Sequence, residues 1–282
     1  MKNQDFSLLR PDSLVAAEIE AKAESVGITK ANMDSKKAFL LSIMAGLYIG
    51  MGGMFMLMVR SDPSFSFATS QLLGGLVFCL GLFLVVAAGA ELFTGNLLMI
   101  CGKLSKRITW LQMLKNLVIV YLGNLLGSLL MVAILFLADY SSFNNGLVGS
   151  TAMTVAAGKI AQPAEALFFK GIMCNFLVCL AVWISFSART LVDKFVAVLF
   201  PITAFVACGF EHCIANMFFL PLGILLSATG FEYLGSADIS VITAGGALYN
   251  LGLVTVGNII GGLVMVGIVY WFIYGKKEQT NA

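Results

Sequence analysis

The sequence predicts an all-α membrane protein whose six transmembrane helices form two inverted three-helix repeats. Its composition is the first reason: 59% of the residues are hydrophobic and only 11% are charged, whereas soluble domains carry about 25% charged residues. Apolar stretches of about 20 residues, the length that crosses a bilayer, recur along the chain. Two of these stretches contain polar inserts, so the second and fifth helices are predicted to be broken.

The predicted membrane spans lie at residues 39–59, 68–101, 111–138, 164–187, 195–228 and 249–274. The second and fifth are too long for one simple crossing, and each contains an insert, so each is predicted to be a single broken helix. These spans define a six-helix transmembrane channel domain over 39–275. An N-terminal segment, 1–38, precedes this domain, and a short tail, 276–282, follows it.

The N-terminal segment contains an amphipathic stretch from Asp12 to Val26. It opens on the helix-start signal Pro11-Asp12-Ser13. Its apolar residues recur at helical spacing, at Leu14, Val15, Ile19 and Ala23. We expect a surface helix that packs on the cytoplasmic face, and a gate for the pathway is the alternative. The segment has no apolar h-region, so no cleaved signal peptide is expected.

Lysine and arginine residues are distributed unequally between the two sides of this topology. Cytoplasmic loops of membrane proteins carry an excess of these residues, and the other side here would hold only Arg60, Lys159 and Lys170. Both termini are therefore predicted to be cytoplasmic, with the protein in the inner or plasma membrane. The formal net charge of +2 is small and scattered, which argues against a nucleic-acid partner.

The two halves of the chain resemble each other. Each broken span is followed by a helix with the motif Gly-Asn-x-x-Gly, at Gly123–Gly127 and at Gly257–Gly261. Small residues let helices approach closely in lipid, so these motifs predict tight helix crossings. Because each half has an odd number of spans, the second half must insert upside down. Inverted repeats of this kind place a transport site at their interface.

The polar inserts are Ala90–Asn96 and Phe210–Asn216. Irregular polar backbone within the bilayer is tolerated only where it is buried in protein or lines a water-filled cavity. A helix break also exposes a new helix N-terminus, whose free N–H groups attract anions. Thr94, Asn96 and Asn216 are predicted to cap these ends. The inserts therefore predict a pathway for a small anion.

Four ionisable residues are candidates for the chemistry of this pathway, namely His212, Glu91, Glu211 and Lys159. An ionisable side chain at mid-bilayer is costly and usually functional, and His212 is the chain's only histidine. It could bind an anion as the cation or donate one hydrogen bond while neutral. Glu91 and Glu211 occupy matching positions in the two inserts. One hypothesis is that they transfer protons; the one we favour is that they accept hydrogen bonds from backbone N–H groups freed by the breaks. Lys159 is predicted to lie in an outer loop. There it either raises the anion concentration at the mouth of the pathway or is an ordinary solvated charge.

Apolar residues surround the inserts in the sequence, namely Phe78, Leu82, Leu92, Phe93 and Phe205. A ring of such side chains narrows a pore and gates it by dewetting, although composition alone would assign each of them to the core or the lipid face. No metal site or cofactor is expected, because the six cysteines have no paired-motif spacing with the histidine. An enzyme is not expected either, since the histidine has no partnering nucleophile motif.

The strings Gly89–Thr94 and Gly209–Met217 resemble the formate/nitrite transporter family. The resemblance extends through Gly171–Trp183 and Val254–Gly262 and covers essentially all six predicted spans. It implies an aquaporin-like protomer with its own pore. It also implies assembly as a homopentamer in the lipid membrane.

The same resemblance implies roles for individual side chains. The cytoplasmic constriction would comprise Leu82 and Phe205, with Phe78 beside them. The outer constriction would comprise the loop residues Leu92, Phe93 and Thr94. The polar centre between the constrictions would comprise His212, Thr94, Asn258 and Asn175, with Lys159 in the outer vestibule.

These features together predict passive or proton-linked transport of a small monovalent anion, formate first. Desolvation between apolar rings raises the pKa of an acid, so the substrate could take up a proton, cross as the neutral acid and release the proton beyond the ring. Nitrite or hydrosulfide is the alternative substrate, because Phe6–Pro11 is similar to formate channels and Phe168–Gly171 is more similar to the nitrite branch. A neutral-solute channel would require paired Asn-Pro-Ala boxes, which neither insert has.

Overall fold

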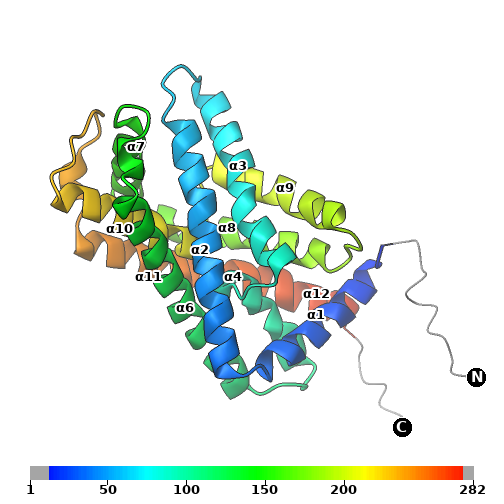
Figure 1. Cartoon of the computed structure of the whole chain (residues 1–282). Helices are drawn as coiled ribbons and strands as arrows, with labels where there is room; N and C mark the ends of the chain where they lie inside the picture. Colours follow the sequence, from blue (N-terminus) through cyan, green and yellow to red (C-terminus); the bar gives the residue numbers. More distant parts are fainter. Residues whose placement is uncertain (1–12, 276–282) are drawn as a thin grey trace, which may run out of the picture.

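Residues 13–275 are described by the computed structural model, and helices make up the regular structure of that range (Figure 1). Five helical rods of this range are long and apolar enough to cross a membrane: α2 (Ser35–Arg60), α3 (Phe67–Ala88), α6 (Trp110–Leu137), α8 (Ala164–Ser185) and the rod Ala244–Tyr274. In the last rod, α11 (Ala244–Ile259) continues through a π-helical stretch, η5 (Ile260–Ile268), into α12 (Val269–Tyr274). The first, third, fourth and sixth predicted spans differ from these rods only at their ends.

The second and fifth predicted spans are broken helices in the structure. α3 ends at Gly89, which has φ +82°, and three short pieces follow: α4 (Phe93–Asn96), η2 (Leu97–Met99) and α5 (Ile100–Leu104). α9 (Leu191–Ala207) is followed in the same way by Gly209, with φ +70°, before α10 (Cys213–Ala228) begins. Glycine adopts this left-handed conformation without a steric penalty. Each break is therefore located by a glycine that lets the helix stop.

α1 (Ala16–Ala31) is the predicted amphipathic helix, but its bounds differ from the predicted stretch. It begins later than Ser13 because the carboxylate of Glu18 accepts the N–H of Val15 at 3.0 Å, which satisfies the first turn. It also extends beyond Val26. α1 packs on η2, α5 and α12, so it lies against the short pieces of the first break.

α7 (Leu147–Ile160) is a helix where the sequence predicted an outer loop. Its 14 residues are too few to cross a bilayer, so its sequence carries no membrane-length apolar signal. α7 packs on α10 and α2, and Lys159 lies in its last turn. The lysine is therefore held by a helix of the bundle.

The matched Gly-Asn-x-x-Gly motifs lie at tight helix crossings, as predicted. A Cβ atom at Gly127 of α6 would overlap the backbone carbonyl of Ile43 in α2. A Cβ atom at Gly261 of η5 would overlap the backbone carbonyl of Ile172 in α8. Only glycine lets these backbones meet. The crossings bring the asparagine of each motif against a broken helix.

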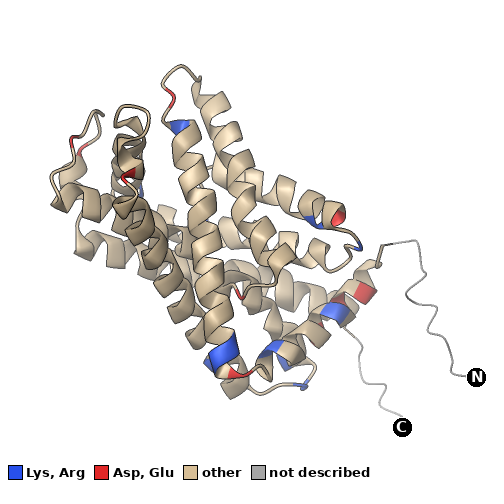
Figure 2. Cartoon of the chain, viewed as in Figure 1, with Lys and Arg blue, Asp and Glu red and all other residues tan. Residues whose placement is uncertain are grey.

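Lysine and arginine gather at one end of the bundle, along α1 and at the start of α2 (Figure 2). α1 and α12 contact each other, so both ends of the described chain lie at this lysine-rich end. The predicted tail, 276–282, and the Phe6–Pro11 motif lie outside the described residues. The side of the membrane on which the termini lie stays a prediction.

Candidate functional site

His212 and Thr94 bring the two broken helices into contact. His212 Nε2 lies 3.0 Å from Thr94 Oγ1, and His212 Nδ1 accepts the backbone N–H of Ala215 at 3.1 Å. Because Nδ1 is used as an acceptor, the neutral ring carries its proton on Nε2 and donates it to Thr94. His212 is therefore the N-cap of α10, and the N-cap of α4 is Leu92, without a side-chain cap bond. The prediction that Thr94, Asn96 and Asn216 cap these helices is wrong. Both side chains of the contact are buried.

Two fully buried asparagines clamp the backbones of the breaks. Asn258 of α11 accepts the N–H of Cys213 at 2.9 Å. It donates to the carbonyls of Gly171 and Glu211, at 2.8 and 2.9 Å. Asn124 of α6 makes the three corresponding bonds in the first break, at the same distances, to Phe93, Ser42 and Glu91.

These clamps satisfy backbone groups that the breaks leave without a helical partner. Asn258 was predicted to line the pore beside His212, but its amide is used on the backbone and it does not line the cavity next to that histidine. The prediction is therefore corrected to a positioning role. The sequence patterns predicted no role for Asn124, and it positions the backbone of the first break in the same way.

Each glutamate of the inserts forms an ion pair with a lysine. Glu91 accepts from Lys30 at 2.6 Å, and Glu211 accepts from Lys159 at 3.0 Å. An asparagine five positions later also donates to each carboxylate at 2.7 Å; these are Asn96 and Asn216. The favoured prediction, that the carboxylates accept from freed backbone N–H groups, is wrong. The asparagine clamps already take N–H groups of the breaks, so the carboxylates are left to the lysines.

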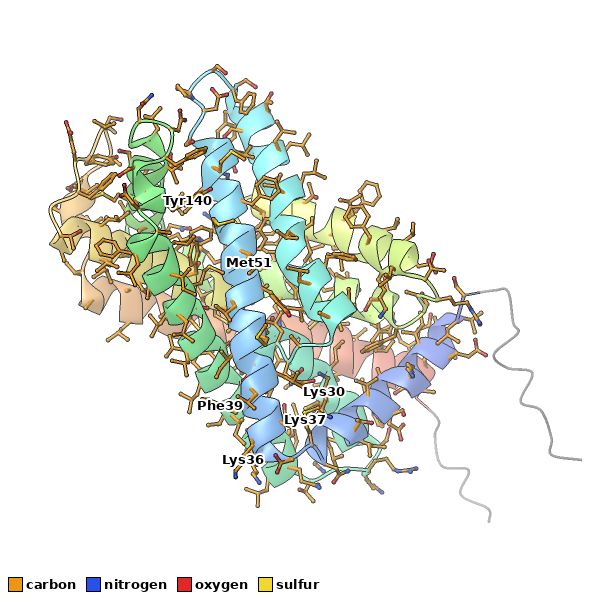
Figure 3. All side chains as sticks on the ribbon, in the orientation of Figure 1. Lys30, Lys36, Lys37, Phe39, Met51 and Tyr140 are labelled. Atoms are coloured by element: carbon orange, nitrogen blue, oxygen red, sulfur yellow. The ribbon has the colours of Figure 1, made fainter. Side chains whose placement is uncertain are left out.

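Lys30 belongs to the polar network of the first break, which the sequence patterns did not reveal, because α1 brings it to Glu91 from 61 positions away. Figure 3 labels Lys30 on α1 and Lys36 and Lys37 at the start of α2, all at the same end of the bundle. Lys36 and Lys37 are exposed, whereas Lys30 is half-buried because its ammonium group is bonded to Glu91.

Asn116 and Asn250 complete the two networks. Asn116 donates to the carbonyl of Lys30 at 3.1 Å, and Asn250 donates to that of Lys159 at 2.9 Å. Each also accepts from the insert asparagine of its own half, at 2.9 and 2.7 Å. A signal for both is present in the sequence, since each precedes the clamp asparagine of its helix by the same separation.

The second network extends further than the first. Gln162 donates to Glu211 at 2.9 Å and accepts from Lys170 at 2.6 Å. This amide links a second lysine to the carboxylate. Among residues 13–275, the Glu91 network has no corresponding amide that links it to a second lysine.

Two cavities lead to the central contact. The α1 vestibule has a volume of about 470 Å³, and its charged lining residues are Lys22, Lys30, Lys194 and Glu91. The α7 vestibule has a volume of about 560 Å³ and reaches His212, and its charged lining residues are Arg60, Lys159, Lys170 and Glu211. Each vestibule therefore has three cations and one carboxylate. A surplus of positive charge at both mouths favours anions.

A chamber of only about 10 Å³ lies between the vestibules, and its lining includes His212, Phe78, Leu82, Leu92 and Phe205. Leu82 and Leu92 also line the α1 vestibule, whereas Phe78 and Phe205 also line the α7 vestibule. The predicted grouping of Leu82 with Phe205 is therefore wrong. Phe78 and Leu82 are about one helical turn apart along α3, so each faces a different vestibule. Phe205 packs on Phe78 instead, with ring centroids 5.9 Å apart.

Phe93 points away from the chamber, so its prediction as a constriction residue is wrong. Its ring packs on Tyr121 of α6 at a centroid distance of 4.9 Å and lines a separate apolar groove. Leu92 has an extended backbone, with φ −113° and ψ 124°. Successive side chains of an extended chain point in opposite directions. Leu92 therefore faces the chamber while Phe93 faces outward.

Asn175 lies behind Thr94 and not in the polar centre that was predicted. Its amide donates to the carbonyls of Asn258 and Thr94, at 2.7 and 3.4 Å. The thiol of Cys179 donates to the same Thr94 carbonyl at 3.2 Å. Asn175 is fully buried and does not line the chamber. Its role is therefore to position Thr94.

Known families and proteins match almost the whole chain. A family model described as Formate/nitrite transporter matches residues 17–272. Formate channel FocA of Escherichia coli is 40% identical over 278 residues, which cover 96% of this chain and 98% of that protein. Nitrite transporter NirC of Salmonella typhimurium is 34% identical over 265 residues, which cover 91% of this chain and 91% of that protein.

Solved structures match over the same range. A pentameric formate channel with formate bound is 40% identical, with a TM-score of 0.77, and the match covers 86% of this chain and 98% of that chain. A chain described as an FNT family ion channel is 31% identical, with a TM-score of 0.79 and coverage of 91% and 98%. The similarity therefore includes both broken helices and the helices that clamp them.

Proposed function

Because this chain belongs to the formate/nitrite transporter family, we propose that it carries small monovalent anions through a membrane, with formate as the first substrate. Members of this family are channels or transporters and not enzymes. One observation carries the proposal: His212 and Thr94 meet at 3.0 Å beside a small apolar chamber, between vestibules in which cations outnumber carboxylates. The formate channels among the relatives support formate as the substrate.

The passenger enters a vestibule as the anion, because lysine and arginine side chains concentrate it there. The chamber has room for about one water, so its apolar wall opens when a larger passenger crosses. Leaving water costs the charged form far more than the neutral form, and desolvation raises the pKa of the acid. The passenger therefore takes up a proton at the chamber and releases it in the opposite vestibule.

His212 is the residue that meets the passenger in this proposal. Its Nε2–H donates to Thr94 in the structure, and it turns to an oxygen of the passenger during passage. This bond replaces part of the hydration that the passenger has lost. A neutral donor suits both the anion and the neutral acid, because it holds neither of them too tightly to leave.

The proposed architecture is a pair of inverted repeats within each protomer. The matched lysine, glutamate and asparagine contacts of the two halves support it. The pentameric relative supports a homopentamer, in which the exposed apolar face of α6 meets lipid or a neighbouring protomer; that face includes Leu114, Val118 and Leu122. We place both termini in the cytoplasm and the protein in the inner or plasma membrane, because the lysine-rich end carries both ends of the described chain.

Flux through the purified protein in liposomes tests the proposal. Formate, nitrite and hydrosulfide are supplied singly and in competition at several pH values. Stopped-flow light scattering records water and glycerol flux on the same vesicles. We expect saturable formate flux that rises as the pH falls, with nitrite as a competitor, as the nitrite transporter relative suggests. Water or glycerol flux without anion flux would contradict the proposal.

Replacement of His212 tests the role assigned to it. His212→Leu installs the residue that follows the glutamate in the first insert, Leu92, and removes the donor. We expect formate flux to fall about tenfold, which corresponds to the loss of one well-placed hydrogen bond. His212→Asn keeps an N–H donor and is expected to recover part of the flux. Unchanged flux in His212→Leu, in protein that keeps its oligomeric state, would remove His212 from the pathway.

A further inference from the structure

Arg60 is a cation of the α7 vestibule that has no carboxylate partner among the described residues. It is the last residue of α2, and its Nη2 donates to Oε1 of Gln71 and, at 3.3 Å, to the carbonyl of Val206. Its Nε is buried without a hydrogen-bond partner. A guanidinium has five N–H donors, so two neutral acceptors leave most of its hydrogen-bonding capacity unused.

The lysines of this vestibule differ from Arg60 in their partners. Lys159 is neutralised by Glu211 at 3.0 Å. Lys170 donates to Gln162 at 2.6 Å, and this amide connects it to the same carboxylate. The acceptors of Arg60 come from two other helices, Gln71 from α3 and Val206 from α9. They fix the guanidinium in place without cancelling its charge.

The fold leaves space for this charge at the wall of the vestibule. A Cβ atom at Gly74 of α3 would lie 2.7 Å from Nε and 3.2 Å from Cγ of Arg60. A larger residue at Gly74 would therefore displace the guanidinium. A partly buried charge without a counter-charge is destabilising, so this arrangement is suited to a site that receives a negative charge from outside the chain.

We propose that Arg60 binds the passenger anion in the α7 vestibule and selects planar oxyanions, a role that rests on the proposed function above. In this role Nη1–H binds one oxygen of the anion, and the neighbouring Nη2–H exchanges its long 3.3 Å bond to Val206 for the other oxygen. These two N–H donors are parallel and match the two oxygens of a carboxylate or of nitrite. Hydrosulfide has one sulfur atom and cannot fill this fork. Phe78 and Phe205 line the same vestibule as Arg60, and the carbonyl that Arg60 binds belongs to the residue after Phe205. The anion is therefore held next to the aromatic wall of the chamber.

Flux kinetics from the α7 side test this role with two variants of Arg60. Arg60→Gln removes the charge, and the formate concentration at half-maximal flux is expected to rise about five- to tenfold, with the maximal flux changed less than about twofold. Arg60→Lys keeps the charge but loses the fork. It is expected to support hydrosulfide flux as well as the parent protein does, and formate flux less well.

The matched control is Arg107→Gln, which removes an exposed arginine that lines neither vestibule, and its flux should equal that of the parent. If Arg60→Gln keeps the parent's half-saturation, or if Arg60→Lys lowers formate and hydrosulfide flux by the same factor, Arg60 only tethers helices and the inference is overturned. A parent protein that carries no formate at all would instead overturn the proposed function.

Chemical labelling gives a second measurement on the unmodified protein. Phenylglyoxal reacts with arginine, and mass spectrometry locates the label among the chain's four arginines, Arg10, Arg60, Arg107 and Arg189. Formate is expected to slow the labelling of Arg60 and to leave that of Arg107 unchanged, whereas equal concentrations of hydrosulfide protect Arg60 less. Labelling of Arg60 that formate does not slow would overturn the inference even if the Arg60 variants failed to fold.

Discussion

The two halves of the molecule build the same polar network on different supports. In each half a lysine pairs with the glutamate of the insert, and a buried asparagine donates to the carboxylate. In the first half the lysine comes from α1, which packs on the short pieces of the break. In the second half the lysine comes from α7, which packs on the longer helix α10. The same lysine–glutamate contact is therefore supported by differently packed helices in the two halves.

This difference shows which half can change independently of the rest. α1 lies at the edge of the bundle (Figure 1), so the Lys30–Glu91 pair depends on the docking of one amphipathic helix. α7 packs on α10 and α2, two helices of the bundle, so the Lys159–Glu211 pair forms when the bundle folds. The inserts also differ chemically, because Leu92 follows the first glutamate and His212 follows the second. At this position the second half therefore supplies a polar ring to the chamber and the first half an apolar side chain.

The largest expected effect comes from removing one lysine at a time. Lys159→Met leaves Glu211 buried and unpaired, which we expect to destabilise the protein by about 3–5 kcal/mol. Lys30→Met should lower the free energy of unfolding by less than about half of that amount, because α1 can move and admit water to Glu91. Denaturation in detergent, followed by tryptophan fluorescence, measures both. Equal losses would mean that α1 is as firmly fixed as α7, and Glu211→Gln should rescue Lys159→Met if the unpaired charge is the cause.

The asparagine clamps should give a smaller and symmetrical effect. Asn124→Ala and Asn258→Ala each remove three hydrogen bonds of matching length. We expect each to lower the free energy of unfolding by about 2–3 kcal/mol, because buried backbone groups lose their partners. The same denaturation assay compares them. A difference of more than about 1 kcal/mol would show that the two breaks are not equivalent in energy.

The smallest expected effect is a pH dependence confined to the α1 half. Glu20 of α1 is buried at 2% exposure with one carboxylate oxygen unpaired, and burial, together with nearby Glu24, raises the pKa of Glu20 to about 6. A raised carboxyl pKa means that docking favours the protonated form. The contribution of Glu20 to the docking of α1 is therefore complete at a pH below 4.5, the ordinary pKa of a glutamate, and is lost as the pH rises through about 6.

Hydrogen exchange measures this loss. After correction for the intrinsic effect of pH on exchange, the amides of α1 should exchange severalfold faster at about pH 7 than at about pH 4.5, an effect of at most about 1 kcal/mol. α7 should show no such change. Glu20→Gln should abolish the difference, and if α1 exchanges at the same corrected rate at both pH values, Glu20 does not control its docking.

The spans, the breaks and the tight crossings could be predicted because each leaves a local signal in the sequence. Apolar length marks a crossing, and a glycine beside a polar insert marks a break. The repeated Gly-Asn-x-x-Gly motif identified where the backbones meet. α7 gave no such signal, because its 14 residues fall below the length of a span.

The side-chain partners required information that the local sequence does not contain. Nothing near Glu91 points to Lys30, since the pair forms only after α1 folds back on the bundle. The directions of Leu92 and Phe93 depend on the extended backbone between them, and the direction of Phe78 depends on the helical turn that separates it from Leu82. The roles of Asn116 and Asn250 could have been predicted from the repeat, because each residue precedes the clamp asparagine of its helix by the same separation.

An imidazole relays protons by accepting one at one nitrogen and releasing another from the second. In His212 the second nitrogen binds the first turn of α10, and protonating it would break that bond. In the proposed mechanism, a proton that crosses together with an anion is therefore bound to the anion itself. The hydrogen bond that starts a helix also prevents the ring from acting as a proton wire, so protons alone should carry no current through this protein.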